Sequence, residues 1–430
     1  MISWLGLRAL VTMEVWLGGM PAFHHTVQKG GKSLSTILVG VDVSKEFSTA
    51  QGVDEKGEKL FYLQFAMDAQ GFSELHKAMM HHTETVTEIT VAMESTGCYH
   101  INLFSFLSSA GIRCVVINPL LITNFTRLSL RKTKTDKKDA QTIAQFLFSN
   151  RESLTTIVFS QDMQDLKDLA RERESLTVLI AGMKNDIKRL LQGTFPELEK
   201  LSRPCGETML HFLRKFPSAR LVRAAKRRDI EKALICPEEK RKRVMVSVDD
   251  LISTAQTSVA SASAAKELIL SEKASTLLYL QEKKERITAM LIETCESLRI
   301  EELDIIRSID GVNDITGSTF LAELGDINKF HSYKHLIAFA GLDPSIHQSG
   351  QYEGRSTISK RGNRHLRRVI FLITLCAVRS KNVFREYFLR RKQEGLPPKK
   401  AILATAHKLI RVMFAMLSNK SLFRKGVVVE

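Results

Sequence analysis

The sequence predicts an α/β domain with a mixed sheet, then a long α-helical coiled-coil region, then a mostly α-helical C-terminal domain. Three observations predict this fold class. Strand and helix signals alternate over residues 36–147, apolar residues recur at three- and four-residue spacing in two later stretches, and positive charge is concentrated near the C-terminus. The 430 residues are enough for two or three domains.

The first predicted strand is STILVGVDVSK, residues 35–45. Period-two alternation places four β-branched side chains on one face and Leu38, Gly40, Asp42 and Ser44 on the other. The segment VDEKGEKL then predicts a hairpin turn, with its glycine at the tip, which leads into a further strand at LFYLQFAM.

The elements that follow alternate between helix and strand. A helix is expected over residues 69–82, then a strand in EITVAMEST, where Glu94 shares a face with Ala92. GIRCVVINP, residues 111–119, predicts a short apolar strand. Strands joined first as a meander and then through helices indicate a mixed sheet, with Asp42 and Glu94 on adjacent central strands.

A basic helix is predicted from TDKKDAQTIAQF, residues 135–146, with Asp136 and Asp139 three residues apart. Such residues share a helix face, with Cβ atoms about 5–6 Å apart, so two ionised carboxylates repel each other unless a cation intervenes. One interpretation is a solvated helix in which the neighbouring lysines neutralise the aspartates.

The alternative interpretation is a single cluster of four carboxylates, formed by Asp42, Glu94, Asp136 and Asp139. Taken separately, Asp42 and Glu94 are compatible with structural acids that have partners, because burying a lone carboxylate is costly. Taken together, the four acids need divalent cations. All-oxygen ligands favour Mg²⁺ or Mn²⁺, and two such ions about 3.5–4 Å apart stabilise the attacking and leaving oxygens of phosphoryl transfer.

Three segments, GVDVSK, AMESTGCYH and KTKTDKKDAQTIA, resemble a known signature. It is the Asp-Glu-Asp-Asp signature of the RuvC-like, RNase H-fold domain in insertion-sequence 110 family transposases, which are relatives of the Piv-type DNA invertases. The resemblance implies that Asp42, Glu94, Asp136 and Asp139 are catalytic metal ligands.

The middle of the chain carries two amphipathic stretches, at about residues 162–193 and 264–298. They predict an antiparallel hairpin or an oligomerising coiled coil, or helices that pack onto the first domain. The interval 201–250 reads as loop-rich, with KRRDIEK and EEKRKR as solvated helix faces or RNA contacts. It is longer than the family pattern requires.

The segment IRSIDGVNDITGSTFLAELGDI, residues 306–327, resembles a helix-hairpin-helix with a turn at Gly311 and a second helix from about Thr316. Amides at such a helix start can hold a phosphate, although a hairpin used only for packing fits equally well. Residues 330–371 match the C-terminal transposase domain of the same family, so the resemblance covers about 36–155 and 295–415.

In that family a serine of this second domain is the nucleophile, and the matching residue here is Ser349 in HQSGQYEG. A serine hydroxyl is a weak nucleophile until a base or a positive field activates it. The cations that could stabilise the pentavalent phosphate are Arg355, Lys360, Arg361 and Arg364. Ser359 is the competing serine, although residues 359–368 read better as a capped helix start aimed at phosphates.

The charge distribution predicts a polyanion partner. Residues 355–430 hold 19 Lys and Arg against 3 Asp and Glu, so this region carries the whole net charge of +16. Concentrated positive charge indicates nucleic-acid binding, here with Arg367 and Arg368 added to the four cations above, although a solubilising surface is the alternative.

The N-terminus and the cysteines indicate the cellular compartment of the protein. The apolar start MISWLGLRALVTMEVWLGGM is interrupted by Arg8 and Glu14 before it could span a bilayer, so it reads as an extension or an amphipathic docking segment. Six cysteines without a CxxC pair fit the reducing cytoplasm rather than a disulfide framework or zinc site.

The expected domains are an extension at 1–35, a RuvC-like domain at 36–155, a helical coiled-coil region at 156–300 with an inserted segment at about 201–260, and a basic transposase domain at 301–430.

The resemblance implies a cytoplasmic transposase or recombinase with no membrane partner. It would act on donor and target DNA through a serine-phosphate intermediate, guided by a structured bridge RNA, as a homodimer or homotetramer with half-sites from different protomers. One alternative is a metal-dependent RuvC-like junction nuclease without a serine nucleophile. Another is a nucleic-acid-binding remnant of a decayed element.

Overall fold

The computed structural model describes most of the chain, and contacts within it define two compact units, Met1–Phe159 and Ser160–Glu430. The described residues are 36–94, 99–117, 119–127, 136–151, 160–234, 246–261, 263–345, 348–349, 352–353 and 357–424. The expected extension at residues 1–35 lies outside them, and the four-part domain division stays a prediction.

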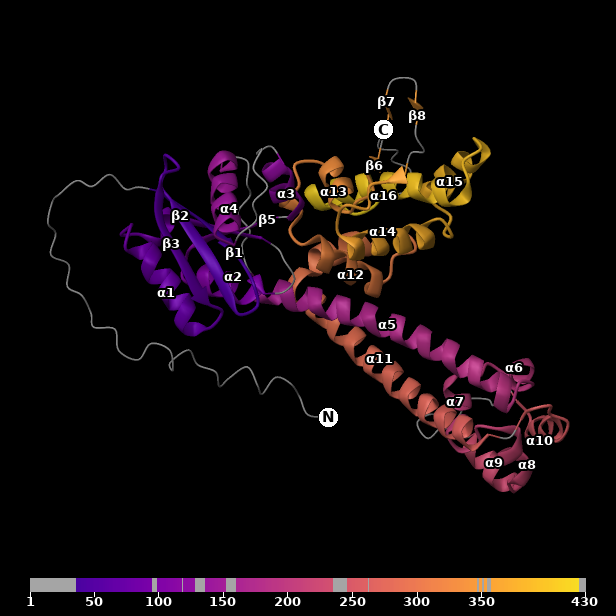
Figure 1. The fold of residues 1–430 in the computed structure, drawn as a ribbon. Helices are drawn as coiled ribbons and strands as arrows, with labels where there is room; N and C mark the ends of the chain where they lie inside the picture. Colours follow the sequence, from indigo (N-terminus) through magenta and orange to yellow (C-terminus); the bar gives the residue numbers. More distant parts are fainter. Residues whose placement is uncertain are drawn as a thin grey trace. The chain divides into compact units, whose positions relative to one another are not determined.

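The first unit is built on a five-stranded mixed sheet in the order β3-β2-β1-β4-β5 (Figure 1). Its strands are β1 (Ile37–Asp42), β2 (Phe47–Val53), β3 (Lys59–Ala66), β4 (Ile89–Glu94) and β5 (Arg113–Ile117). The first three form an antiparallel meander, whereas β1, β4 and β5 run parallel. The predicted mixed sheet is confirmed, with β1 and β4 as adjacent central strands.

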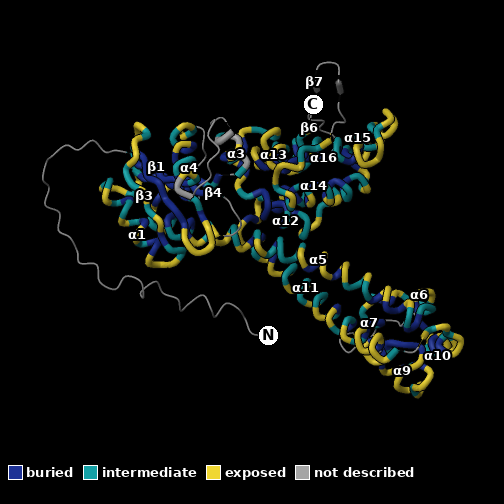
Figure 2. Tube along the Cα trace, in the orientation of Figure 1, coloured by how far each residue is buried: buried dark blue, intermediate teal, exposed yellow. Residues whose placement is uncertain are grey.

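Helices cover both faces of this sheet, which is why β1 and β4 are buried along their length (Figure 2). Phe72 of α1 and Leu103 of α2 pack on the face of Ile37 and Val39. On the other face, α3 and α4 contribute to a second core that includes Leu38 and Ala92. The helical elements are α1 (Ala69–Met80), the short η2 (Val86–Glu88), α2 (His100–Ser109), α3 (Pro119–Arg127) and α4 (Asp136–Asn150); of these, only α1 and α4 were predicted by their residues.

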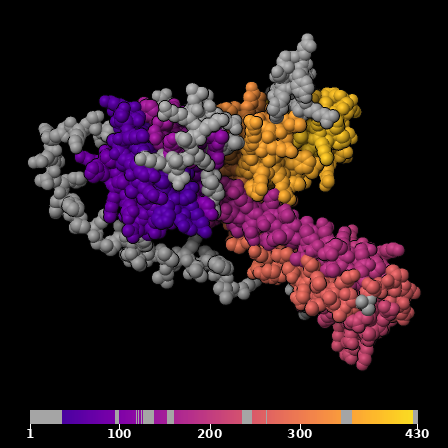
Figure 3. Space-filling view, viewed as in Figure 1, coloured from indigo at the N-terminus to yellow at the C-terminus, as the bar shows by residue number. Residues whose placement is uncertain are grey.

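The second unit begins with a helical hairpin in which α5 (Gln161–Thr194) packs along α11 (Ala264–Arg307), as Figure 3 shows. Two ion pairs join the helices, Glu172 with Lys283 at 2.8 Å and Asp186 with Lys273 at 2.6 Å, so residues further along α5 pair with residues nearer the start of α11. The two helices are therefore antiparallel, one of the predicted arrangements. The predicted end of the second helix coincides with a break in α11, where Arg299 has non-helical dihedrals.

The prediction of a loop-rich interval between the two long helices is wrong. The described residues of the interval form five short helices that share a core with α5 and α11, to which Leu210, Val222, Ile230 and Leu251 contribute. They are α6 (Leu198–Leu201), α7 (Glu207–Lys215), α8 (Ala219–Ala224), α9 (Arg227–Ala233) and α10 (Val248–Gln256). Short amphipathic segments separated by turns look irregular in sequence, and burial against α5 and α11 stabilises them as helices.

The two charged clusters of this interval differ. In KRRDIEK, Arg227 forms ion pairs with Asp249 and Glu231, while Ile230 faces the core. The cluster EEKRKR lies outside the described residues. KRRDIEK is therefore partly a solvated helix face and partly a tie between α9 and α10.

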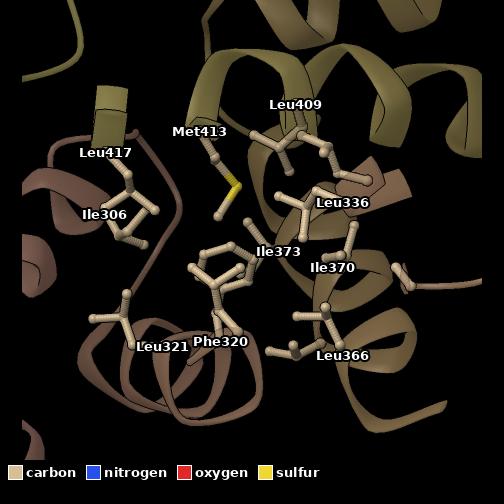
Figure 4. Close-up of a cluster of buried hydrophobic side chains, with 14 of the residues drawn as sticks. Ile306, Phe320, Leu321, Leu336, Leu366, Ile370, Ile373, Leu409, Met413 and Leu417 are labelled. Atoms are coloured by element: carbon tan, nitrogen blue, oxygen red, sulfur yellow. The ribbon is translucent and has the colours of Figure 1, made fainter. Parts of the chain in front are cut away.

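The rest of the second unit is a helical domain around one apolar core, in which Phe320, Leu336, Ile373 and Met413 meet from four helices (Figure 4). Its elements are α12 (Asp314–Leu324), η3 (Ile327–Lys329), α13 (Tyr333–Phe339), β6 (Pro344–Ser345), β7 (Gln348–Ser349), β8 (Tyr352–Glu353), β9 (Thr357–Ile358), α14 (Arg364–Ala377), α15 (Val383–Gln393) and α16 (Pro398–Ser418). Among the described residues, α16 alone has the length and hydropathy of a membrane span. Its apolar side chains lie in this core, which accounts for its composition.

The segment that resembles a helix-hairpin-helix forms a turn between the end of α11 and α12. Gly311 takes a positive φ of 96° in the turn, and α12 begins at Asp314. Asn313 and Thr316 form a capping box, and Asp314 binds Arg307 at 2.7 Å. The first turn of α12 thus caps itself and carries a negative charge, which favours the interpretation as a packing hairpin.

Candidate active site

Two of the four acids lie side by side at the ends of the central strands. β1 and β4 are parallel and pair Val41 with Met93, so the next residues, Asp42 and Glu94, follow in register. Both are half-buried and end their strands. The sequence alternation predicted the common face, whereas the pairing of β1 with β4 depends on the sheet topology.

The helix that carries the other two acids packs against the same face at very short range. A Cβ atom added to Gly40 would lie 2.2 Å from the backbone nitrogen of Ala144 and 2.5 Å from the carbonyl oxygen of Ala140. Asp139, half-buried, directly precedes Ala140, and Asp136 begins the helix, although its side chain lies outside the described residues. Gly40 therefore lets α4 approach β1 closely enough to bring its first turns toward Asp42 and Glu94.

The donor chemistry of this site fits a divalent cation. Each side chain offers only carboxylate oxygens, and neighbouring carboxylates repel each other without a positive charge between them. Among the described residues no three acidic, histidine or cysteine side chains approach closely enough to hold a metal ion. A complete ligand set would therefore need Asp136 together with Asp42, Glu94 and Asp139.

We expect Gly40→Ala to lower strand exchange far more than it lowers stability. The added methyl group must displace the α4 backbone, which costs about 1–3 kcal/mol as overpacking and moves both aspartates. Urea unfolding and a recombination assay would measure the two effects. Gly182→Ala on α5 is the control, because nothing lies within 4 Å of that site and a helical alanine adds about 0.5–1 kcal/mol of stability. Wild-type strand exchange by Gly40→Ala would contradict this account.

Ser349, the predicted nucleophile, is the last residue of β7 and pairs with Tyr352 of β8. The strands β6 and β9 pair at the base of the same connection, through Pro344 with Ile358 and Ser345 with Thr357. The side chain of Ser349 and all of Arg355 lie outside the described residues. Ser349 is thus placed on a strand pair that leads out of the helical core.

The segment after β9 is held to the end of α13 by backbone hydrogen bonds. The amides of Lys360 and Asn363 donate to the carbonyl oxygens of Gly341 and Phe339, at 3.1 and 2.8 Å. Lys360 takes a positive φ of 55°, an uncommon conformation for a residue other than glycine. We call residues 359–363 the cation loop, because Lys360 and Arg361 are exposed on it.

The predicted capped helix start within residues 359–368 is present, but Ser359 is not its cap. Asn363 is the N-cap of α14, and its side-chain oxygen accepts hydrogen bonds from the amides of His365 and Leu366. The hydroxyl of Ser359 instead donates to Asp343 at 2.5 Å, and a serine beside a carboxylate is the arrangement of an activated nucleophile. Ser359 therefore remains the competing serine.

The cations predicted to contact nucleic acid fall into two groups. Lys360, Arg361 and Arg364 are exposed. Arg367 donates to the carbonyl oxygen of Ala340 at 2.9 Å, and Arg368 binds Glu174 of α5 at 2.7 Å. The first group is therefore better placed to meet a phosphate, and the second group also links α14 to its neighbours.

One buried charge near this loop was not singled out from the sequence. Glu323 of α12 is 3% exposed and binds Arg171 of α5 at 2.8 Å and Asn363 at 2.7 Å. Burial opposes its ionisation, but the hydrogen bonds from Arg171 and Asn363 outweigh burial and lower the pKa of this carboxyl. A glutamate among apolar residues of a helix gives no sequence signal that would identify its partners.

A mixed five-stranded sheet with acids at the ends of its central strands, followed by long helices and a helical domain, is the arrangement of an enzyme with an RNase H-like domain. A transposase family model of the IS110 type, with the acidic DEDD domain, matches residues 39–196, and the model of the transposase IS116/IS110/IS902 family matches residues 303–389. The chain belongs to the IS116/IS110/IS902 transposase family.

Several curated proteins are similar over most of their length. An uncharacterized protein of insertion element IS116 from Streptomyces clavuligerus is 27% identical, over 90% of this chain and 96% of its own. The transposase for insertion sequence element IS1111A from Coxiella burnetii is 26% identical, over 93% and 94%. The pilin gene-inverting protein of Moraxella bovis is 21% identical, over 92% and 99%.

The protein is therefore an enzyme of DNA transposition that binds DNA, and its DEDD domain implies a carboxylate metal site. The predicted family, fold class and type of enzyme are confirmed. The individual site residues, the metal, the serine step, the guide RNA and the oligomeric state stay predictions.

Proposed function

We propose that this transposase cuts and rejoins DNA through a covalent phosphoserine formed by Ser349, assisted by Mg²⁺ held by Asp42, Glu94, Asp136 and Asp139. The observation that carries the proposal is the register of β1 and β4, which sets two carboxylates at adjacent strand ends under the helix that carries the other two. All four donors are carboxylate oxygens, which suit Mg²⁺ or Mn²⁺.

Each chemical step exchanges one ester for another. The Ser349 oxygen attacks the phosphorus, the bond from phosphorus to the 3′ oxygen breaks, and the 5′ phosphate stays on the serine. The serine gives its proton to solvent and the departing 3′ oxygen takes one up. A 3′ hydroxyl of another strand then attacks the phosphoserine and restores the serine. Bound divalent cations would stabilise the charge on the oxygens that attack and leave.

The cations of the second unit support the binding of the reacting phosphate. Lys360, Arg361 and Arg364 are exposed on the cation loop and on the first turn of α14. An exposed guanidinium can bind two phosphate oxygens at once, and preorganised positive charge stabilises a pentavalent phosphate. In this proposal the four carboxylates act on the same phosphate during strand exchange, and they are those of Asp42, Glu94, Asp136 and Asp139. They belong either to the same protomer as the cations or to another one.

The guide RNA and the assembly are part of the same proposal. Exposed cations on the helices at the tip of the α5–α11 hairpin would suit a second polyanion: Arg214, Lys215, Arg223, Lys226, Arg228 and Lys232. Exposed apolar side chains on the hairpin, Val178, Leu179, Tyr279 and Met290, would suit contact between copies in a dimer or tetramer. Sequencing the RNA that co-purifies with the protein tests the first point.

Trapping on a nicked DNA substrate tests the serine step. A phosphoserine enzyme leaves a covalent protein–DNA adduct that survives denaturation, whereas a junction nuclease that uses only metal ions leaves none. Cleavage of DNA in Mg²⁺ without any adduct would overturn the proposal in favour of the nuclease. A protein that binds DNA but neither cleaves nor forms an adduct would fit the remnant of a decayed element.

We expect replacement of Lys360, Arg361 and Arg364 by glutamine to weaken DNA binding for all sequences. Each lost phosphate contact should make the dependence of log K on log salt less steep by about 0.7–0.9, which a titration at several salt concentrations measures. Arg368→Gln is the matched control, because Arg368 already binds Glu174 and should change the slope less. An unchanged slope in the triple variant would show that these cations do not contact phosphate.

A further inference from the structure

Glu323 joins three helices through one buried carboxylate. Its oxygens accept hydrogen bonds from the Nε and a terminal nitrogen of Arg171, at 2.8 and 3.1 Å, and from the side-chain amide of Asn363 at 2.7 Å. Arg171 belongs to α5, Glu323 to α12, and Asn363 precedes α14. A buried charge is costly unless it is paired and hydrogen-bonded, and this one is both.

Asn363 links Glu323 to the cation loop and to α14. Its side-chain oxygen accepts hydrogen bonds from the backbone amides of His365 and Leu366, at 3.0 and 3.1 Å, and its backbone amide donates to the carbonyl oxygen of Phe339. One side chain therefore caps α14 with its oxygen and binds Glu323 with its nitrogen. Arg361 and Arg364 lie on either side of it in the chain.

The loop has no room to adjust at this point. A Cβ atom on Gly362 would lie 2.2 Å from the carbonyl oxygen of Phe339, so the backbone before Asn363 is in close contact with the end of α13. Any shift of the Asn363 side chain must therefore move the loop or the start of α14. A helix cap by itself needs only an oxygen at this position, so capping does not account for the bond to Glu323.

We propose that Glu323 and Asn363 are positioning residues that orient Arg361 and Arg364 toward the DNA phosphate that reacts in strand exchange. The proposal rests on the proposed function, because it assumes that these cations meet that phosphate. Neither positioning residue touches the DNA. They act by fixing the loop, and a displacement of about 1 Å in a positioned group can cost up to about 100-fold in rate.

The decisive variant is Asn363→Asp. It keeps an oxygen that can cap α14, removes the amide donor, and places a second carboxylate against Glu323. At saturating DNA we expect the rate constant for adduct formation to fall on the order of 10- to 100-fold, while the dissociation constant for DNA changes much less. Adding Glu323→Gln to this variant should recover most of the rate, because the introduced amide can donate to the introduced carboxylate.

Asn382→Asp is the matched control. Asn382 caps α15 with its side-chain oxygen, which accepts from the amides of Phe384 and Arg385, and its side-chain nitrogen donates to the backbone carbonyl oxygen of Asp310 instead of a carboxylate. We expect this variant to lose a similar amount in melting temperature and to keep the wild-type rate. Glu323→Gln alone preserves the side-chain shape and serves as the second variant if Asn363→Asp does not fold.

The outcomes separate the two proposals. If the wild-type protein cleaves DNA without an adduct, the serine step fails and the same variants are compared by their cleavage rates. If Asn363→Asp and Glu323→Gln both keep the wild-type rate constant at saturating DNA, the positioning role is wrong. It is also wrong if the double variant reacts no faster than Asn363→Asp, or if Asn382→Asp slows the reaction as much as Asn363→Asp.

Discussion

Ser349→Ala is expected to abolish both the covalent protein–DNA adduct and the recombinant product. The substitution removes the oxygen that takes the DNA strand, and loss of a nucleophile of this kind lowers the rate by at least about 1000-fold. The fold should be retained, since the substitution removes a single oxygen from a residue on a two-residue strand of a two-stranded sheet. A nicked substrate with a labelled strand, denaturing gel analysis and a recombination assay measure the two losses together.

Ser359→Ala is the companion variant, because Ser359 is the competing serine. It loses a hydrogen bond to Asp343 that ties the cation loop to β6, so it should slow the reaction while still forming the adduct. If Ser359→Ala abolishes the adduct and Ser349→Ala retains it, the nucleophile is Ser359, with Asp343 as its base. If both variants form the adduct, neither Ser349 nor Ser359 is the nucleophile.

Asp139→Asn is expected to abolish strand exchange while DNA binding remains. Mg²⁺ requires near-ideal octahedral oxygen ligands, so loss of one charged ligand should lower activity by on the order of 100-fold or more, and higher Mg²⁺ or Mn²⁺ should recover part of it. Without metal the variant should be at least as stable as wild type, because one of several repelling charges is removed. Mg²⁺ should raise the melting temperature of wild type and not of the variant, a readout that is independent of activity.

Glu74→Gln on α1 is the control for this change in charge. Glu74 is exposed on a helix that covers the opposite face of the sheet, so strand exchange and the response of the melting temperature to Mg²⁺ should both stay at wild-type values. Full strand exchange by Asp139→Asn would contradict the assignment of Asp139 as a metal ligand. The same change of melting temperature with Mg²⁺ in both variants would contradict it as well.

The order of strands and helices in the first unit could be predicted because it depends on local alternation. β1 and β4 repeat apolar residues at every second position, and this alone places Asp42 and Glu94 on one face of each strand. The family resemblance could be read for the same reason, since its motifs are short and continuous in sequence. Helix α3 was missed because it is only nine residues long and begins at Pro119, the residue at which the predicted strand was taken to end.

Other features could not be read from local patterns. The helices at the tip of the α5–α11 hairpin form because Leu210, Val222 and Ile230 are buried together, although they are far apart in a segment that looks irregular. The helix start within residues 359–368 was predicted without its capping residue, since serine and asparagine are both good N-caps and the sequence does not show which of Ser359 and Asn363 binds the first amides of α14. Arg367 and Arg368 looked like phosphate contacts, but they have partners on other elements.

The sequence by itself determined the family and most of the types of element, and it predicts the four acids and the serine that the family pattern selects. Only the tertiary structure decided that β1 lies beside β4, that α4 approaches β1 at Gly40, and that Glu323 holds Asn363. The physical reason is the range of the interactions. Periodicity, capping and turn preferences act over a few residues, whereas strand pairing, close helix approach and buried ion pairs join residues 40 to 152 positions apart and form only when the whole unit packs.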